Sequence, residues 1–379
     1  MSAKQRKRKP LSGRFAVFFT ILLFVCTVIF LNNRFASGSL RRISYWIFNG
    51  VRGDATEATI NFDANEYNKF AVLKGNLCVI SPEKLSVYKL SGKELLSEPV
   101  LLRSPAVSTS DSRFIAYDLG GLNYYIANNR ELLFSGTCDS QILNANMNKS
   151  GDVAIVTDSD DCKSLVTVYD SHFEAIYKFH SSEKYVFDAA VSPNGKTVAI
   201  ASYGTEEGIF ESTLLLGKTN SDSFYNEIPL GDSIPLKVTY HTDSKILVIC
   251  NDKTVLYNSD GTLFSEISYG ELPLRSFSES KGKHIGLLLD NYQNGGNSRL
   301  VIINSNGESR ILDFDEDVYS ISCSGLLTSV QFSDKCSVYK NDLSLHSEFM
   351  IPTSISRCIT NSDGSVLSVG ENFATLYIE

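Results

Sequence analysis

The stretch SPNGKTVAIAS, Ser192–Ser202, carries the strongest fold signal in the chain. Pro193 presets the backbone for a turn, and Asn194-Gly195 supplies two residues that tolerate a positive φ. Thr197–Ala201 is a short run of β-branched and small apolar residues, which is typical of a buried strand. The stretch therefore predicts a tight turn that leads directly into a strand.

Weaker copies of this turn-and-strand pattern recur along the chain: NKSGDVAI at 148–155, HTDSKILV at 241–248 and NSDGSVLS at 361–368. A spacing of roughly 40 to 50 residues is the sequence signature of propeller blades. The pattern resembles the S-P-D/N-G-K hairpin of WD40-like and related bacterial β-propellers. This resemblance covers residues 56–379 and implies an all-β fold with a single propeller. Because Trp-Asp dipeptides and kelch-type double-glycine spacing are absent, it indicates neither a true WD40 array nor a kelch repeat.

Short strand-like segments bounded by Gly, Pro, Asn or Ser fall into consecutive units. The last unit offers only three such segments, and an exposed strand edge invites aggregation. Thr56–Phe62 is an otherwise unassigned strand, and we predict that it completes this unit and closes a ring of about eight four-stranded blades. Seven blades remain the alternative if the first unit is irregular. The seven complete units are 68–98, 103–136, 139–180, 184–231, 232–270, 271–314 and 315–352.

A long apolar run precedes the propeller. Residues 15–33 carry no charge, and at about 1.5 Å per residue they span roughly 28 Å, close to the hydrocarbon thickness of a bilayer. Residues 1–14 hold six cations and no acid, which favours a cytoplasmic N-terminus by the positive-inside rule. The sequence therefore predicts a cytoplasmic tail (1–14), a transmembrane signal-anchor helix (15–33), a juxtamembrane linker (34–55) and an extracytoplasmic propeller (56–379).

Two observations leave alternatives to this topology. Arg34, Arg41 and Arg42 follow the apolar run and weaken the charge asymmetry. Ala36-Ser37-Gly38 offers a small-residue cleavage site, so a cleaved signal peptide competes with an uncleaved anchor. The layout, one N-terminal anchor and one degenerate propeller, is similar to membrane-anchored propellers of anaerobic Gram-positive bacteria. That resemblance implies a domain of unknown function.

The propeller is strongly acidic. Residues 1–53 carry ten cations and no acid, so the remainder has a formal net charge of −18 against −8 for the whole chain. An acidic body repels polyanions, and nucleic acid is therefore not an expected partner.

No catalytic, cofactor-binding or metal-binding residue can be assigned from motifs. Neither a Gly-x-Ser-x-Gly elbow nor a phosphate-cradling glycine loop occurs. Trp46, the single tryptophan, lies outside the repeats, which argues against a quinone-dependent dehydrogenase. Five histidines lack metal-ligand spacing and are expected as polar residues of loops or strand ends: His172, His180, His241, His284 and His346.

Two acidic clusters are expected to be solvated loops, with calcium binding as the alternative. Asp313–Asp317 has the alternating carboxylates of a calcium loop, but Val318 and Ser324 stand where the loop needs Gly and Glu. Asp158–Asp161 falls in a predicted hairpin loop.

Seven cysteines follow the apolar run, and an odd number cannot all pair within one chain. Most lie in strand patterns, which favours buried free thiols. Exported chains usually avoid unpaired thiols, so the pattern fits an anaerobe or the opposite membrane orientation. The seven are Cys78, Cys138, Cys162, Cys250, Cys323, Cys336 and Cys358.

These features predict a membrane-anchored binding or scaffolding module rather than an enzyme, with a protein, peptide or envelope glycan bound at the propeller face. One alternative is a lactonase-like or glycan-acting hydrolase with carboxylates at the channel. The other is a sensory or assembly subunit that contacts a membrane partner through its anchor helix.

Overall fold

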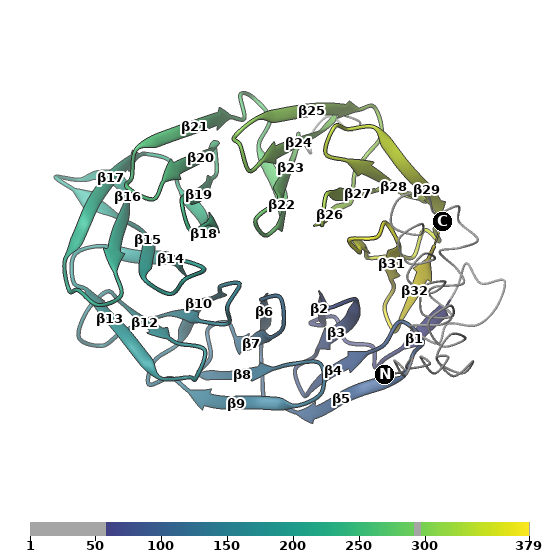
Figure 1. Cartoon of the computed structure of the whole chain (residues 1–379), viewed down its shortest axis with the longest axis horizontal. Coiled ribbons are helices and arrows are strands. Elements are labelled where there is room, and N and C mark those ends of the chain that lie inside the picture. Colours follow the sequence, from purple (N-terminus) through teal and green to yellow (C-terminus); the bar gives the residue numbers. More distant parts are fainter. Residues whose placement is uncertain (1–57, 292–296, 379) are drawn as a thin grey trace, which may run out of the picture. The chain divides into compact units, whose positions relative to one another are not determined.

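The computed structural model describes residues 58–291 and 297–378. Strands β1–β32 form eight antiparallel sheets of four strands each, set around a common centre (Figure 1). The predicted all-β, eight-bladed propeller is confirmed, and the seven-blade alternative is wrong. The predicted transmembrane helix and linker lie outside the described residues. Those residues contain no helix long and apolar enough to cross a membrane.

Blades one to seven each use four consecutive strands, with the first strand innermost. Blade one contains β2 (Lys69–Leu73), β3 (Asn76–Ile80), β4 (Lys84–Tyr88) and β5 (Glu94–Pro99), and blade two contains β6 (Pro105–Thr109), β7 (Phe114–Asp118), β8 (Asn123–Ala127) and β9 (Leu132–Thr137). Blade three contains β10 (Ile142–Met147), β11 (Val153–Thr157), β12 (Ser164–Tyr169) and β13 (Ala175–Ser181), and blade four contains β14 (Tyr185–Val191), β15 (Thr197–Glu206), β16 (Ile209–Lys218) and β17 (Phe224–Gly231). Blade five contains β18 (Pro235–Thr242), β19 (Lys245–Cys250), β20 (Lys253–Asn258) and β21 (Leu263–Ser268), and blade six contains β22 (Leu274–Ser280), β23 (His284–Asp290), β24 (Ser298–Asn304) and β25 (Ser309–Phe314). Blade seven contains β26 (Ser320–Ser324), β27 (Leu327–Gln331), β28 (Lys335–Lys340) and β29 (Leu345–Met350). Blade eight contains β30 (Arg357–Thr360), β31 (Val366–Val369) and β32 (Phe373–Tyr377), with β1 (Ala58–Asn61) as its fourth strand.

The turn at the centre of the sequence pattern forms as predicted. Gly195 has a φ of +72°, and its N–H donates to the carbonyl of Ser192 at 2.9 Å. Thr197 donates its N–H to the hydroxyl of Ser192 at 3.0 Å, which joins the turn to the following strand. A residue with a side chain would be strained at this φ, which explains the glycine.

The ring closes by pairing its two ends. Strand β1 pairs antiparallel with β32, so that Ile60 lies opposite Ala374. Ile60 is fully buried, and the N–H of Phe62 donates to the carbonyl of Asn372 at 3.0 Å. The predicted fourth strand of blade eight is therefore confirmed, and the described chain leaves no open edge on β32.

The two faces of the ring carry different loops. The hairpin face carries the turns between first and second strands and between third and fourth strands, such as 192–196 in blade four. The connection face carries the remaining loops and the segments between blades, such as 232–234. As a fourth strand, β1 begins at Ala58 on the hairpin face. Ala58, the first described residue, therefore lies on the hairpin face.

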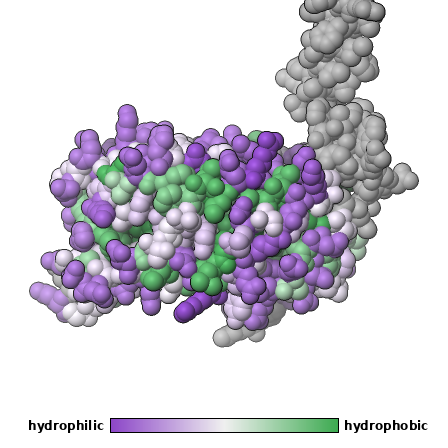
Figure 2. All heavy atoms as spheres, turned by 90° about the horizontal axis from the view of Figure 1, so that it is seen from below, coloured by the Kyte–Doolittle hydropathy of each residue, from purple (hydrophilic) through white to green (hydrophobic). Residues whose placement is uncertain are grey.

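The core lies between neighbouring blades. Ala199 and Leu214 of blade four pack with Val238 and Val248 of blade five, and every one of these side chains is fully buried. Each of the buried Leu and Val side chains contributes roughly 1.5 to 3 kcal/mol. Figure 2 shows one side of the ring, over blades one to three, where apolar side chains form a band at the surface.

One polar contact between blades six and seven predicts pH-dependent stability. His284 is fully buried, and its Nε2 lies 2.8 Å from the hydroxyl of Thr328. Burial lowers the pKa of His284 from 6.5 to about 4. Below pH 6.5 the unfolded chain binds a proton that the folded chain does not bind, so stability falls as the pH drops towards 4 and this loss levels off below it.

We expect the wild type to lose roughly 3 kcal/mol more unfolding free energy than His284→Gln between pH 7 and pH 4. Gln retains the polar contact but does not titrate. Denaturant unfolding at a series of pH values measures the difference, and parallel pH curves for the two proteins would contradict the assignment.

Candidate functional site

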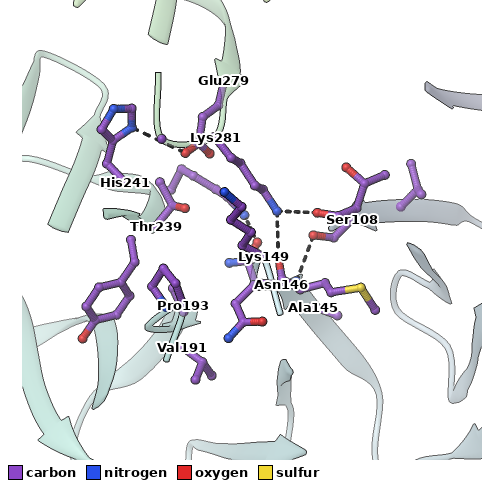
Figure 3. A pocket seen from close by; sticks show the side chains of 18 of the residues that line it. Ser108, Ala145, Asn146, Lys149, Val191, Pro193, Thr239, His241, Glu279 and Lys281 are labelled. Atoms are coloured by element: carbon purple, nitrogen blue, oxygen red, sulfur yellow. Dashed lines mark hydrogen bonds and ion pairs between the residues drawn. The ribbon is translucent and has the colours of Figure 1, made fainter. Parts of the chain in front are cut away.

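A cavity of about 700 Å³ lies in the central channel towards the hairpin face. The innermost strands of blades one to six line it, together with turns such as 148–149 and 242–243 (Figure 3). Such a volume is within the range of small-molecule sites. Polar side chains from blades three, five and six give this cavity its chemistry.

β-Bulges aim three polar side chains into one network. The innermost strands of blades three, four and five each contain a bulge, immediately before Asn144, Asp188 and Lys237 respectively. A bulge adds one residue and re-aims the side chains that follow it. Asp188 accepts hydrogen bonds from the side chains of Asn144 at 3.0 Å and Asn146 at 2.7 Å.

Asp188 also joins blade four to blade five. It accepts the N–H of Val238 at 2.8 Å, and the ammonium group of Lys237 lies 3.5 Å from its carboxylate. Burial raises the pKa of Asp188, while Lys237 and the hydrogen bonds oppose that rise. With its oxygens occupied in this way, Asp188 is a structural group that holds the lining residues Asn144, Asn146 and Lys237 in place.

Lys281 reaches across the channel. Its ammonium group comes from the first turn of blade six and donates to the carbonyls of Thr109, in blade two, and Met147, in blade three, the latter at 2.7 Å. Burial lowers the pKa of Lys281. These contacts tie the far walls of the cavity together and place a cation at its centre (Figure 3).

His241 and Glu279 are the cavity's unsatisfied polar pair. His241 is 3% exposed, and its Nδ1 lies 3.9 Å from Oε1 of Glu279. Among the described residues, neither ring nitrogen of His241 nor Oε1 of Glu279 has a hydrogen-bond partner. Buried polar atoms in native proteins are normally paired, and each exception needs an explanation. Both side chains lie in the cavity wall, so a polar ligand bound in the cavity would supply the missing hydrogen-bond partners (Figure 3).

Of the histidines and acidic clusters that the sequence singled out, His241 lines the cavity and the others lie elsewhere. The five histidines occupy loops or strand ends as predicted, but their burial was not foreseen for His241 and His284. Asp158–Asp161 lies in the hairpin loop between β11 and β12, and Asp313 pairs with Arg299 at 2.6 Å. Within the described ranges, no group of three or more His, Cys, Asp or Glu residues is arranged to hold a metal ion.

The cysteines match the prediction of buried thiols in most cases. All seven are free; Cys138 and Cys162 are half-buried and the other five are buried. Burial raises the pKa of Cys78 to about 12, so its thiol is unreactive near neutral pH.

Three comparisons place the chain among known proteins. The β-propeller domain of Myceliophteria thermophila Cps50 (Swd1) aligns with 11% identity and a TM-score of 0.50, over 73% of this chain and 96% of that one. The C-terminal WD40 domain of Sif2 aligns with 11% identity and a TM-score of 0.58, over 85% and 98%. At this identity both show the fold alone. No curated protein sequence matches. Residues 51–372 match the model of a family of unknown function, DUF5711, and the chain belongs to that family.

Proposed function

We propose that the protein is a single-pass membrane protein whose extracytoplasmic propeller is a binding module, with its ligand seated in the channel cavity at the hairpin face. The propeller fold supports the general role, since propellers commonly bind other molecules through a face or channel. The ligand belongs to the cell envelope or to a protein partner.

The pair of buried His241 and half-buried Glu279 is the observation that carries this proposal. A carboxylate oxygen and two imidazole nitrogens without partners are costly in a protein interior, and ligand groups that donate and accept hydrogen bonds would satisfy them. Lys281 supplies a cation beside them. The set suits a polar ligand with several hydrogen-bonding groups, such as a glycan or a peptide.

Ala58, the first described residue, and the cavity both lie towards the hairpin face of the ring.

Photo-cross-linking in intact cells tests the binding role. A photoreactive residue in place of Lys149, which is exposed at the cavity rim, is expected to give a defined adduct that is lost when Glu279→Gln is added. The matched control is the same residue in place of Lys178, exposed on the outer strand β13. Equal adducts at both positions, or none at position 149, would count against the proposal.

The hydrolase alternative has one observation in its favour, the contact between His241 and Glu279 in the cavity. Glycoside hydrolysis usually needs two carboxylates at a defined separation. Asp188, a buried acid behind the cavity lining, is committed to structural hydrogen bonds. Binding is therefore the better-supported role.

A further inference from the structure

A second cavity adjoins the first on the side of the connection face. It has a volume of about 430 Å³ and is lined by the innermost strands of blades one, six, seven and eight. It shares Phe70, Phe277 and Ser278 with the channel cavity. Its remaining lining residues differ, and so does its chemistry.

Arg357 is the one charged residue in the lining of this second cavity. It is the first residue of β30 and is exposed. Within the described part of the chain, its guanidinium group has neither an ion pair nor a hydrogen bond. Its guanidinium carbon lies 6.0 Å from the centroid of the Phe70 ring. Partial enclosure lowers the pKa of Arg357, but a guanidinium group stays charged in proteins.

Most serines of this cavity are already engaged in hydrogen bonds. The hydroxyls of Ser278, Ser320 and Ser322 accept hydrogen bonds from backbone N–H groups of the next blade, at 2.9, 3.4 and 3.3 Å. These bonds lock the innermost strands of blades six, seven and eight together. Arg357 is therefore the charged group of this lining that remains available to a ligand.

Aromatic side chains form the apolar wall. Phe277 is 36% exposed and Tyr319 is 53% exposed, although both lie at the inner strands of the ring. Exposed rings in a cavity suit a flat apolar group, which stacks against them. Phe70, beside the guanidinium group, extends this wall.

We infer that this cavity binds a carboxylate carried on an aromatic group. A guanidinium fork matches the two oxygens of a carboxylate, and the rings of Phe277 and Tyr319 hold the flat group beside it. No acid in the lining competes for Arg357. The ligand is either a small arylalkanoic acid or the carboxyl terminus of a polypeptide that ends in an aromatic residue. This inference is independent of the proposed hairpin-face site.

Calorimetric titration of the full-length protein in detergent tests the inference with two matched pairs of probes. The first pair is 3-phenylpropionate and 3-phenylpropionamide; the second is an acetylated tripeptide ending in Phe as the free acid and as the amide. We expect an acid to bind roughly 10- to 100-fold more tightly than its amide, the usual preference conferred by a charged hydrogen bond. Binding of the small acid alone, or of the peptide acid alone, identifies the source.

Three variants locate the effect. Arg357→Gln should abolish the preference for the acid, and Arg357→Lys should leave it smaller than in the wild type, because Lys keeps the charge but lacks the fork. Arg310→Gln, at an exposed position on the outer strand β25, should leave it unchanged. Equal affinity for acid and amide, no binding of any probe, or an equal loss in Arg310→Gln would overturn the inference. Arg357→Lys keeps the test valid if Arg357→Gln does not fold.

Discussion

Deletion of Ala58–Asn61 is expected to open the ring and cost the propeller roughly 5 kcal/mol, from about 2 kcal/mol for burial of Ile60 and about 1 kcal/mol for each backbone hydrogen bond lost with β32. Strand β32, which contains the buried Leu376, would become an exposed edge. We expect a lower melting temperature, aggregation on size-exclusion chromatography and early proteolysis near the C-terminus.

The matched control for this deletion removes four residues from the predicted linker, 34–55. Because the linker contributes no strand in the closure scheme, this variant should melt like the wild type. Ile60→Asp tests the same junction without shortening the chain, since it places an unpaired charge at a fully buried position. If both deletions melt alike and remain monomeric, strand β1 does not hold the ring closed.

Removal of the Asp188 carboxylate is the second change with a large expected effect. Asp188→Ala leaves Lys237 without its buried partner and removes the acceptor of the Val238 N–H. Breaking a buried ion pair from one side costs about 3 to 5 kcal/mol, because the remaining charge is uncompensated. Thermal or denaturant unfolding measures this cost.

An exposed ion pair provides the control for Asp188→Ala. Asp313 pairs with Arg299 at 2.6 Å on the outer part of blade six, and its side chain is 64% exposed. Exposed pairs of this kind contribute between about 0 and 1 kcal/mol, so Asp313→Ala should have little effect. Similar destabilisation by the two variants would show that the Asp188 network is not the junction described here.

The ring and its closure could be predicted because both depend on local signals. Turn residues around Gly195 fix a hairpin, and strands alternate with turns at regular spacing. A count of strands then exposed the missing fourth strand of the last unit, for which Thr56–Phe62 was the available segment. The structure confirms this pairing.

The cavity residues could not be predicted in the same way. Asp188 lies in the segment YVFDAAV, which reads as an apolar strand, and its partners Asn144 and Lys237 come from other blades. His241 and Glu279 come from the innermost strands of neighbouring blades, and their approach depends on the stagger between those blades. Single-sequence patterns report turns and strand faces but not this stagger. The bulges before Asn144, Asp188 and Lys237 likewise leave no clear sequence signal.

We propose that the N-terminal segment tethers the propeller to the membrane and that the propeller meets its ligand outside the cytoplasm. Protease treatment of intact protoplasts tests it most directly, with antibodies against a tag before residue 1 and against the propeller. The six cations of residues 1–14 predict that the propeller is digested while the N-terminal tag stays protected. Protection of the propeller until the protoplasts are lysed would contradict the claim and reverse the orientation.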